Sequence, residues 1–216
     1  MLHARRGQSL PLRLDGSETV FMVRTATLMF RIALREDLRQ VVTLLYPGDV
    51  FRAAFAPLKA GAHLSAVSEG QVFRLRFETF ATLAAEDPAV AACFDKALAQ
   101  QTARQAIHLA AVGQLDCLQR LATFLTELAV YTGTPAPNGG VVFEMPLRRS
   151  DMADHLGLNS DTLSRTMSRL RAAGLLTQPN RQKAFIHDLS ALAALTPAAP
   201  SLMALHGKMQ REIRGA

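Results

Sequence analysis

The sequence predicts an α+β fold in which an N-terminal antiparallel β barrel or sandwich is followed by a long helix and a C-terminal helix-turn-helix. Three observations support this prediction. Short runs of β-type residues, separated by polar or Gly-containing breaks, occupy residues 18–80. Residues 87–112 carry a stripe of side chains spaced at threes and fours, as on one face of a helix. Residues 149–174 then encode two short helices joined by a tight turn.

Length and composition limit the class of protein. A chain of 216 residues with 49% hydrophobic residues can build two cores. The net charge of +6 favours an anionic partner, and residues 146–190 hold seven Lys or Arg against four Asp. No apolar run reaches the roughly 18 residues of a membrane span, and the first residues lack the apolar stretch of a secretory signal. We therefore expect a cytoplasmic protein that does not contact a membrane.

The N-terminal part predicts strands after a short irregular segment. Residues 1 to about 15 are basic and are expected to form a loosely held arm. The β-type runs that follow are TVFMVRTATLMFRIAL, RQVVTLLYPGDVF and HLSAVSEGQVFRLRF, with a turn at Pro47 and Gly48. Such runs indicate a small antiparallel barrel or sandwich.

A long helix is expected next. Asp87 can cap it and Pro88 suits its first position, and the pattern continues to about Val112. The stripe is too long for a small domain to bury alone, so it favours a helix shared between two copies, although a helix buried within its own chain is the alternative. The stripe consists of Val90, Phe94, Ala97, Gln101, Arg104 and His108. Gly113 should interrupt it, and residues 115–131 form a second amphipathic helix.

The helix-turn-helix is defined by its caps. Ser150 should cap the first helix, with Asp151 adding negative charge near its positive end. Gly157 should end that helix, Asn159 should cap the second helix, and Gly174 should close it in a left-handed conformation. The turn is therefore about three residues long, as this motif requires.

The second helix has two chemically different faces. Leu163, Met167 and Leu170 share an apolar face, and the opposite face carries Asp161, Ser164, Arg165 and Ser168. Arg165 can donate two hydrogen bonds to guanine, Asp161 can accept from a cytosine amine, and Ser164 suits either base edge. Positive side chains that could hold phosphates flank this face or follow in a β-hairpin, namely Arg148, Arg149, Arg169, Arg171, Arg181 and Lys183. The alternative is an amphipathic hairpin with a solvated charged face.

The run LRRSDMADHLGLNSDTLSRTMSRLRAAGLL, residues 147–176, resembles the winged helix-turn-helix of the catabolite activator protein and fumarate-nitrate regulator (Crp/Fnr) family. The resemblance is strongest to the nitrogen-fixation and anaerobic regulators, whose recognition helix carries Glu-x-x-Ser-Arg. Here Asp161 replaces the Glu, with Ser164 and Arg165 matching. The resemblance implies a homodimer with residues 87–112 as its seam, an inverted-repeat operator with TTGAT-type half-sites, and RNA polymerase as a partner. The shorter Asp can alter the base read.

The resemblance extends to the N-terminal half. Residues 39–51 and 66–83 are similar to the family's jelly-roll sensor domain. The family's cyclic-nucleotide pocket uses a Gly-Glu pair and an Arg beside a small hydroxyl residue, and RAAFAPLKAGAHLS between Phe51 and Ala66 has neither. The resemblance therefore implies a degenerate sensor that binds no cyclic nucleotide, with Lys59 and His63 in the lost pocket region.

Cysteine and histidine content limits the cofactors. The family's iron-sulfur variant needs four cysteines, and only Cys93 and Cys117 exist. Buried, inert thiols are the first interpretation of both, and a redox-responsive thiol is the alternative. His3 or His63 could ligate haem, although a lone His on a loop is more often a surface residue. We expect no cofactor, and no catalytic motif such as GxSxG, GxxxxGK[ST] or HExxH occurs, so we expect no enzyme.

The sequence thus predicts four parts: a degenerate jelly-roll sensor domain at 1–86, a dimerisation helix at 87–112, a winged helix-turn-helix at 113–195 and an extra helix at 196–216. The function expected is a sequence-specific DNA-binding transcription regulator. Two alternatives stay open: a regulator whose DNA binding requires a ligand or haem, and an interaction protein whose helical hairpin faces another protein.

Overall fold

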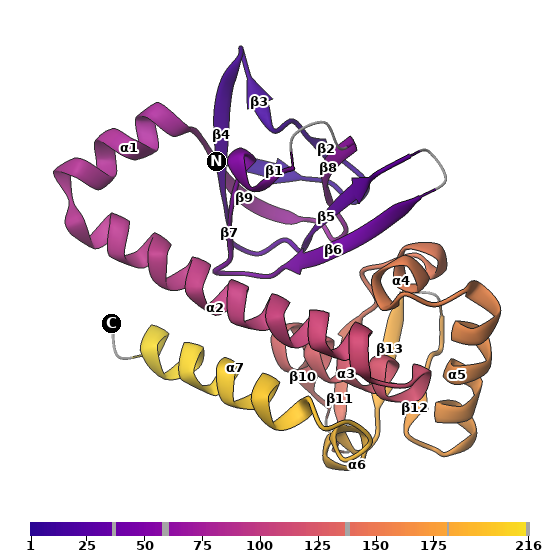
Figure 1. Cartoon of the computed structure of the whole chain (residues 1–216). Coiled ribbons are helices and arrows are strands. Elements are labelled where there is room, and N and C mark those ends of the chain that lie inside the picture. The colour runs from indigo at the N-terminus through magenta and orange to yellow at the C-terminus, as the bar shows by residue number, and fades with distance from the viewer. Residues whose placement is uncertain (36–37, 58–60, 137–138, 181, 215–216) are drawn as a thin grey trace. The chain divides into compact units, whose positions relative to one another are not determined.

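The computed structural model describes residues 1–35, 38–57, 61–136, 139–180 and 182–214, with residues 208–214 described by their backbone alone. The chain divides into two compact units, Met1–Thr102 and Ala103–Ala216. The boundary falls inside one long helix, and each unit is described separately below (Figure 1).

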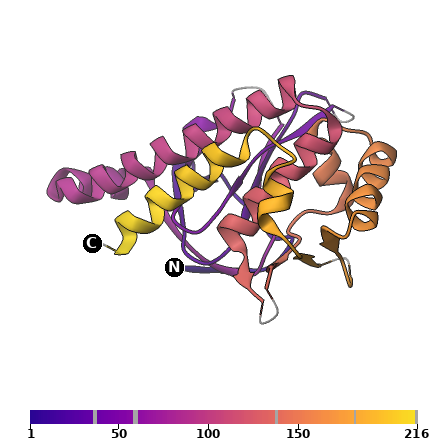
Figure 2. The same cartoon turned by 90° about the horizontal axis from the view of Figure 1, so that it is seen from below.

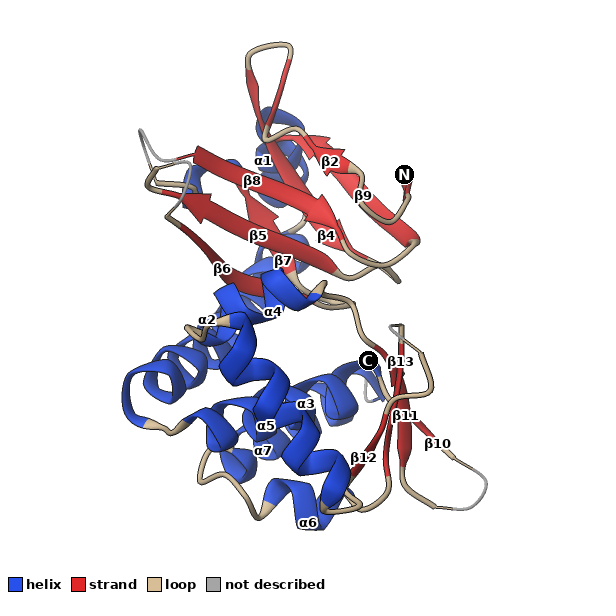
Figure 3. Cartoon of the chain, turned by 90° about the vertical axis from the view of Figure 1, so that its right-hand side faces the viewer, coloured by secondary structure: helices blue, strands red, loops and turns tan. Residues whose placement is uncertain are grey.

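The first unit is built on two antiparallel sheets (Figure 3). One sheet contains β1 (Leu2–Ala4), β9 (Gly70–Arg76), β4 (Ser17–Val23) and β3 (Arg13–Leu14), with β7 (Val50–Arg52) also paired to β4. The other contains β2 (Ser9–Leu10), β8 (Gly61–Ala66), β5 (Leu28–Ala33) and β6 (Arg39–Leu45). The expected jelly-roll class of this half is confirmed.

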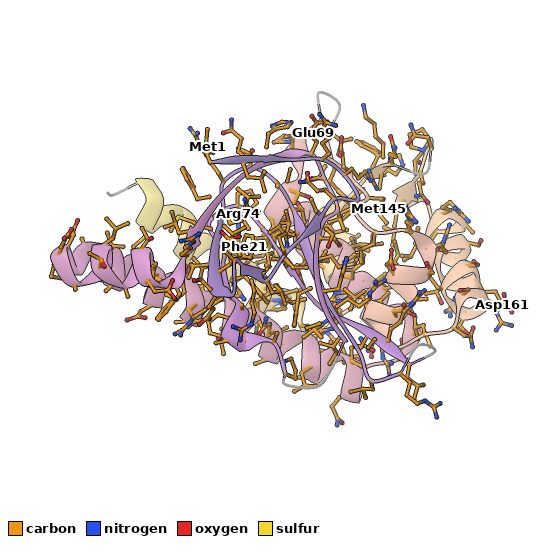
Figure 4. All side chains as sticks on the ribbon, turned by 90° about the horizontal axis from the view of Figure 1, so that it is seen from above. Met1, Phe21, Glu69, Arg74, Met145 and Asp161 are labelled. Carbon is orange, nitrogen blue, oxygen red and sulfur yellow. The ribbon has the colours of Figure 1, made fainter. Side chains whose placement is uncertain are left out.

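The core of the first unit lies between the sheets. Every second residue of a strand points inward, so Leu28 and Phe30 of β5 and Leu64 of β8 enter the same apolar cluster. Phe21, fully buried, lies inside the barrel in Figure 4, and the rings of Phe30 and Phe51 approach to 4.8 Å between centroids. Aliphatic side chains and the rings of Phe21, Phe30 and Phe51 thus fill the interior between the sheets.

The expected irregular N-terminal arm is wrong. Residues 2–4, 9–10 and 13–14 pair as strands with β9, β8 and β4, and Ala4 and Leu10 are buried in the core. These strands are only two or three residues long, which is too short for an alternating pattern to reveal them. The predicted turn at Pro47 and Gly48 is confirmed, since Gly48 has a φ of 92°.

Helices follow the first unit's strands. A 3₁₀ turn, η1 (Ala53–Phe55), follows β7, and α1 (Phe77–Glu86) leads to α2 (Pro88–Gln114). Asp87 caps α2 as predicted, because its Oδ1 accepts from the Ala89 N–H at 2.9 Å. The predicted break at Gly113 is wrong: α2 continues past it, and α3 (Cys117–Thr132) begins at Asp116, which forms a reciprocal capping box with Gln119. Two N–H groups satisfied by Asp116 fix the break more firmly than a glycine does.

The second unit surrounds α3, whose Leu121, Leu125 and Leu128 are fully buried, as the sequence predicted. It contains α4 (Arg149–Leu156), α5 (Ser160–Ala172), α6 (Leu189–Ala193), α7 (Ala199–Arg214) and a sheet of β10 (Thr134–Pro135), β11 (Val141–Glu144), β13 (Lys183–Ile186) and β12 (Leu176–Thr177). The extra helix expected near the C-terminus is confirmed as α7, and Leu202 on it is fully buried. Among the described residues, no helix has the length and apolar character needed to cross a membrane.

Candidate nucleic-acid interface

Two helices joined by a three-residue turn form the centre of the candidate interface (Figure 1). α4 ends at Gly157, which is left-handed with a φ of 61°, and the Asn159 side chain accepts from the Thr162 N–H at 2.7 Å to begin α5. A Cβ at residue 157 would lie 3.3 Å from Val112 Cγ1 and 3.4 Å from Arg120 Nη1. Both backbone conformation and space therefore favour glycine here.

The start of α4 differs from the prediction. The helix begins at Arg149 after an extended Arg148, which makes no side-chain cap bond, so Ser150 lies inside the first turn and does not cap it. Met145 and Leu147 are buried and direct the chain into the helix, and this packing outweighs a cap worth about 1 kcal/mol. Asp151 lies in the first turn, as predicted.

The inner face of α5 anchors it to its unit. Leu163, Met167 and Leu170 are each at most 1% exposed, and Ala153 of α4 is also buried. α5 contacts α3 and α4. Three fully buried side chains stabilise this attachment by roughly 5–9 kcal/mol on transfer scales, before entropy costs are deducted. The recognition face is therefore held by a rigid helix.

The outer face of α5 carries the predicted polar set. Asp161, Ser164, Arg165 and Ser168 are all exposed, and Figure 4 shows Asp161 pointing away from the helices of its unit. In the views of Figures 1 and 2, α5 runs along the outer edge of the second unit, with no other element of that unit beyond it. A surface of this shape can enter a groove.

Positive side chains gather at one end of this pair of helices. Arg149 begins α4, and Arg171 lies in the last turn of α5. Partial burial lowers the pKa of Arg149, and the neighbouring charge of Arg171 lowers it further. Arg171 Nη2 donates to Ser168 Oγ at 2.9 Å, and Ser168 Oγ donates to the Ser164 carbonyl at 3.0 Å. Arg169 is also exposed, in the same last turn.

The predicted β-hairpin after α5 is confirmed. β12 and β13 pair antiparallel, with Leu176 opposite Ile186. Asn180 Oδ1 accepts from the Gln182 and Lys183 N–H groups at 2.8 Å, which shapes the tip. Lys183, the first residue of β13, is exposed, whereas Arg181 lies outside the described residues.

Arg120, which the sequence analysis did not identify, supports the turn between α4 and α5. Arg120 of α3 donates to the carbonyls of Leu115, Leu156 and Gly157 at 2.8, 3.2 and 3.4 Å. It thereby satisfies carbonyls left open at the ends of α2 and α4. An Arg within the apolar pattern of residues 115–131 was the available signal.

A pair of histidines joins α2 to α4 within the second unit. The rings of His108 and His155 stack at 4.0 Å between centroids and 5° between planes, and Phe124 of α3 lies edge-on to His155. Burial lowers the pKa of His108, whose ring bonds the His155 backbone. The stripe predicted for dimerisation is thus already in contact with its own chain at His108.

The other stripe residues are also largely covered. Phe94 packs with Val20 and Val50 in the first unit. Arg104 pairs with Glu127 at 3.8 Å and lies over the Tyr131 ring at 4.9 Å. Gln101 is 3% exposed, while Val90 and Ala97 are half-buried. In contrast, the opposite side of α2 is exposed at Ala103, Ala106, Leu109, Ala110 and Gly113.

The candidate ligand residues of the first unit do not form a metal site. His3 contacts Glu69 at 2.7 Å. Burial, and then the charge of Arg31, lowers the pKa of His63, which lies opposite Arg31 on the neighbouring strand of the same sheet. No group of three potential metal ligands occurs within the described ranges. Cys93 is exposed, which corrects the expectation that both thiols are buried, and Cys117 is half-buried. Lys59 lies outside the described residues.

The carboxylate of Glu18 binds the side chain of Arg52, the last residue of β7, and the backbone N–H of Ala54. Glu18 accepts from Arg52 Nε and Nη2 at 2.7 and 3.1 Å and from the Ala54 N–H at 2.8 Å. The hydrogen bond from Arg52, with a smaller contribution from the Ala54 N–H, lowers the pKa of Glu18 although burial opposes the shift. The Arg52 guanidinium also lies 3.6 Å from the centroid of the Phe77 ring.

Known proteins resemble this chain in its C-terminal part and over most of its length. Residues 119–195 match the model of the Crp-like helix-turn-helix domain. The nitrogen fixation regulation protein FixK of Azorhizobium caulinodans is 27% identical over 185 residues, which cover 83% of this chain and 72% of that relative. The structure of FixK2 from Bradyrhizobium japonicum has a TM-score of 0.72 at 23% identity, covering 90% of this chain and 96% of its own. CprK complexed with OCPA has a TM-score of 0.63 at 14% identity, covering 90% and 88%.

Proposed function

Because the chain belongs to the Crp/Fnr family of transcription regulators, close to FixK, we propose that it binds an inverted-repeat operator as a homodimer without cyclic nucleotide or iron-sulfur cluster. The observation that carries the proposal is the exposed face of α5, held in place by a fully buried opposite face. Regulation of transcription by DNA binding, and not catalysis, is the activity of the relatives, so the expectation of no enzyme is confirmed.

Three side chains of α5 are proposed to read bases in the major groove. Arg165 donates to guanine O6 and N7, Ser164 contacts a neighbouring base edge, and Asp161 accepts from a cytosine amine. The TTGAT-type half-site is the starting expectation. Asp161 is one methylene shorter than the Glu of related regulators, so the base pair opposite it is where the operator should differ.

Four positive side chains are proposed to contact phosphates. Arg149, Arg169 and Lys183 are exposed near α5, and Arg181 belongs to the same hairpin in sequence although it lies outside the described residues. Phosphate contacts fix the register of the helix in the groove without reading sequence. They also make the affinity depend steeply on salt.

The dimer is proposed to form along α2. An inverted repeat needs two recognition helices about one helical turn of DNA apart, which a two-fold dimer provides. The predicted stripe of Val90, Phe94, Ala97, Gln101, Arg104 and His108 largely contacts the chain's own domains, so the available seam is the exposed side of the same helix. There Ala103, Ala106, Ala110 and Gly113 are spaced by three and four residues, and Leu109 is 73% exposed. Small residues at this spacing allow two helices to approach closely.

Independence of cyclic nucleotide is proposed from the interior of the first unit. Apolar side chains fill the space between the sheets, and the Glu18 carboxylate accepts hydrogen bonds from the Arg52 guanidinium and the Ala54 N–H. A phosphate needs donors of this kind. An incoming nucleotide would therefore have to displace both a packed core and an internal ion pair.

A second candidate is a regulator whose DNA binding requires an apolar effector or haem. A hollow of about 210 Å³ in the first unit favours the effector, since it is lined by Val20, Met22, Phe73, Leu75, Phe80 and Phe94. CprK, whose fold is similar, has been solved with OCPA bound.

We also propose RNA polymerase as the protein partner and the cytoplasm as the compartment.

Selection of genomic fragments with the purified protein at physiological salt tests the proposal. We expect an inverted repeat bound in the nanomolar range, a steep salt slope and no change on adding cyclic AMP. An absorption spectrum of the same preparation reports bound haem. Weak, sequence-independent binding would contradict the proposal. Binding that appears only with a cell extract of small molecules would support the effector-dependent alternative.

A further inference from the structure

The hydroxyl of Ser168 forms two hydrogen bonds within α5. Its single proton is donated to the Ser164 carbonyl at 3.0 Å, and its oxygen accepts from Arg171 Nη2 at 2.9 Å. A hydroxyl has only one proton to donate, and this bond to the residue one turn earlier also fixes the side-chain rotamer. Although Ser168 lies on the recognition face, it has no donor left for a base edge.

Arg171 is consequently held in one place. The long Arg side chain normally samples many rotamers, and fixing it in one of them costs conformational entropy. The bond to Ser168 restricts it before any partner arrives. Arg149 of the preceding helix lies close enough for the two positive charges to interact, although the helices α4 and α5 run in different directions.

Arg171 lies in the last turn of α5, and Arg149 begins α4. A DNA phosphate accepts charge-assisted hydrogen bonds from a guanidinium group. Binding of a phosphate to Arg171 would also offset the repulsion between the two positive charges and release counterions.

We propose that Ser168 is a positioning residue whose hydroxyl holds Arg171 in place for contact with a DNA phosphate. This inference rests on the proposed DNA-binding function and deepens it. Base reading is thereby confined to Asp161, Ser164 and Arg165, and Ser168 acts through Arg171.

A double-mutant cycle on the full-length protein tests this arrangement. Operator affinity is measured for wild type, Ser168→Ala, Arg171→Ala and the double variant, against the operator and its single-base variants at several salt concentrations. Ser168→Ala should weaken every sequence by a similar factor of about three to ten. Arg171→Ala should reduce the salt slope by about 1. The double variant should bind no more weakly than Arg171→Ala alone.

Ser168→Thr is the matched control, because it keeps the hydroxyl and should bind within about twofold of wild type. Circular dichroism of each variant checks that α5 is intact. A change of preference at one base pair in Ser168→Ala, or additive losses in the double variant, would overturn the inference while leaving the proposed function intact. A wild-type protein that binds no operator would overturn both.

Discussion

At the residue scale, the proposed function gives different roles to arginines of α5 that look alike in sequence. Arg165 lies on the exposed face with Asp161 and Ser164, whereas Arg169 and Arg171 lie in the last turn. Arginines that approach a base edge discriminate between sequences, and arginines that approach a phosphate do not. Under the proposed function, position on the helix, and not residue type, separates the two roles.

Substitution of Arg165 by Ala should therefore cost about 1–3 kcal/mol at one base pair and relax specificity there. Arg169→Ala should weaken all sequences alike and lower the salt slope by about 1. Titration of both variants against a matrix of single-base operator changes distinguishes these outcomes. Equal, sequence-independent losses would remove Arg165 from the base-reading set.

A second residue-scale prediction concerns the stacked histidines. Because burial lowers the pKa of His108, the folded protein binds that proton less readily than the unfolded chain does. The stability contributed by this site is therefore full above a pH of about 6.5 and is lost as pH falls toward the folded-state pKa. His108→Phe keeps a ring beside His155 without titrating. Its melting temperature should fall less between pH 7.5 and 5.5 than that of wild type, and an unchanged slope would contradict this.

At the element scale, α2 has one covered and one uncovered side, and the uncovered side is made of small residues with Leu109 at its centre. A helix that exposes an apolar residue to 73% gains by burying it against a second copy, by roughly 2 kcal/mol for each copy's Leu. The proposed dimer seam therefore depends on the whole exposed side of α2 and not on one residue.

A charge placed in this seam should separate the dimer. Ala106→Glu brings two carboxylates together across the two-fold axis, where burial of like charges is unfavourable. Sedimentation velocity should show a monomer at concentrations where wild type is dimeric, with a matching loss of operator affinity. Ala85→Glu, also on an exposed helix face, serves as the control and should stay dimeric. If Ala106→Glu remained dimeric, the seam would lie elsewhere.

At the scale of the whole molecule, the second unit depends on a segment beyond the family's helix-turn-helix. The match ends at residue 195, but Thr123 of α3 bonds Thr196 at 2.7 Å in a buried contact. α7 then packs on α3, with Leu202 fully buried and the His206 ring 4.8 Å from that of Tyr131. Tyr131 also carries Arg104 on its ring, so α7, α3 and α2 are joined through one side chain.

Leu202→Ala should accordingly destabilise the second unit by about 2–5 kcal/mol, the range for removing a buried leucine. Chemical denaturation followed by circular dichroism measures this loss. Met203→Ala on the same helix is the matched control, because Met203 is 43% exposed and should change stability little. Similar effects of both substitutions would show that α7 does not contribute to the core.

Local signals in the sequence predicted several helix ends but not all of them, since Ser150 does not cap α4. Gly157 and Asn159 set the turn between the helices, and Asp87 begins α2, because each acts on its own backbone within three residues. The break at Asp116 was missed because a glycine was weighted above a capping box.

Contacts between distant segments were not predictable in this way. The short N-terminal strands exist because β4, β8 and β9 offer them edges, and Glu18 meets Arg52 across 34 residues of chain. Arg120 reaches the end of α4 across a similar separation. All four polar residues of the exposed face of α5 were predicted, but the hydrogen bond between Ser168 and Arg171 is visible only in the structure.

The packing of α7 on α3 bears on attempts to exchange DNA-binding specificity between regulators. A chimera joined at residue 195 would carry α5 but leave the site of Leu202 open, and Thr123 would lose its hydrogen bond to Thr196 while keeping the one to the Gln119 carbonyl. Such a hybrid would aggregate for reasons unrelated to its operator. A graft of this recognition module should instead include the final helix, so that the transplanted unit arrives with its own core closed.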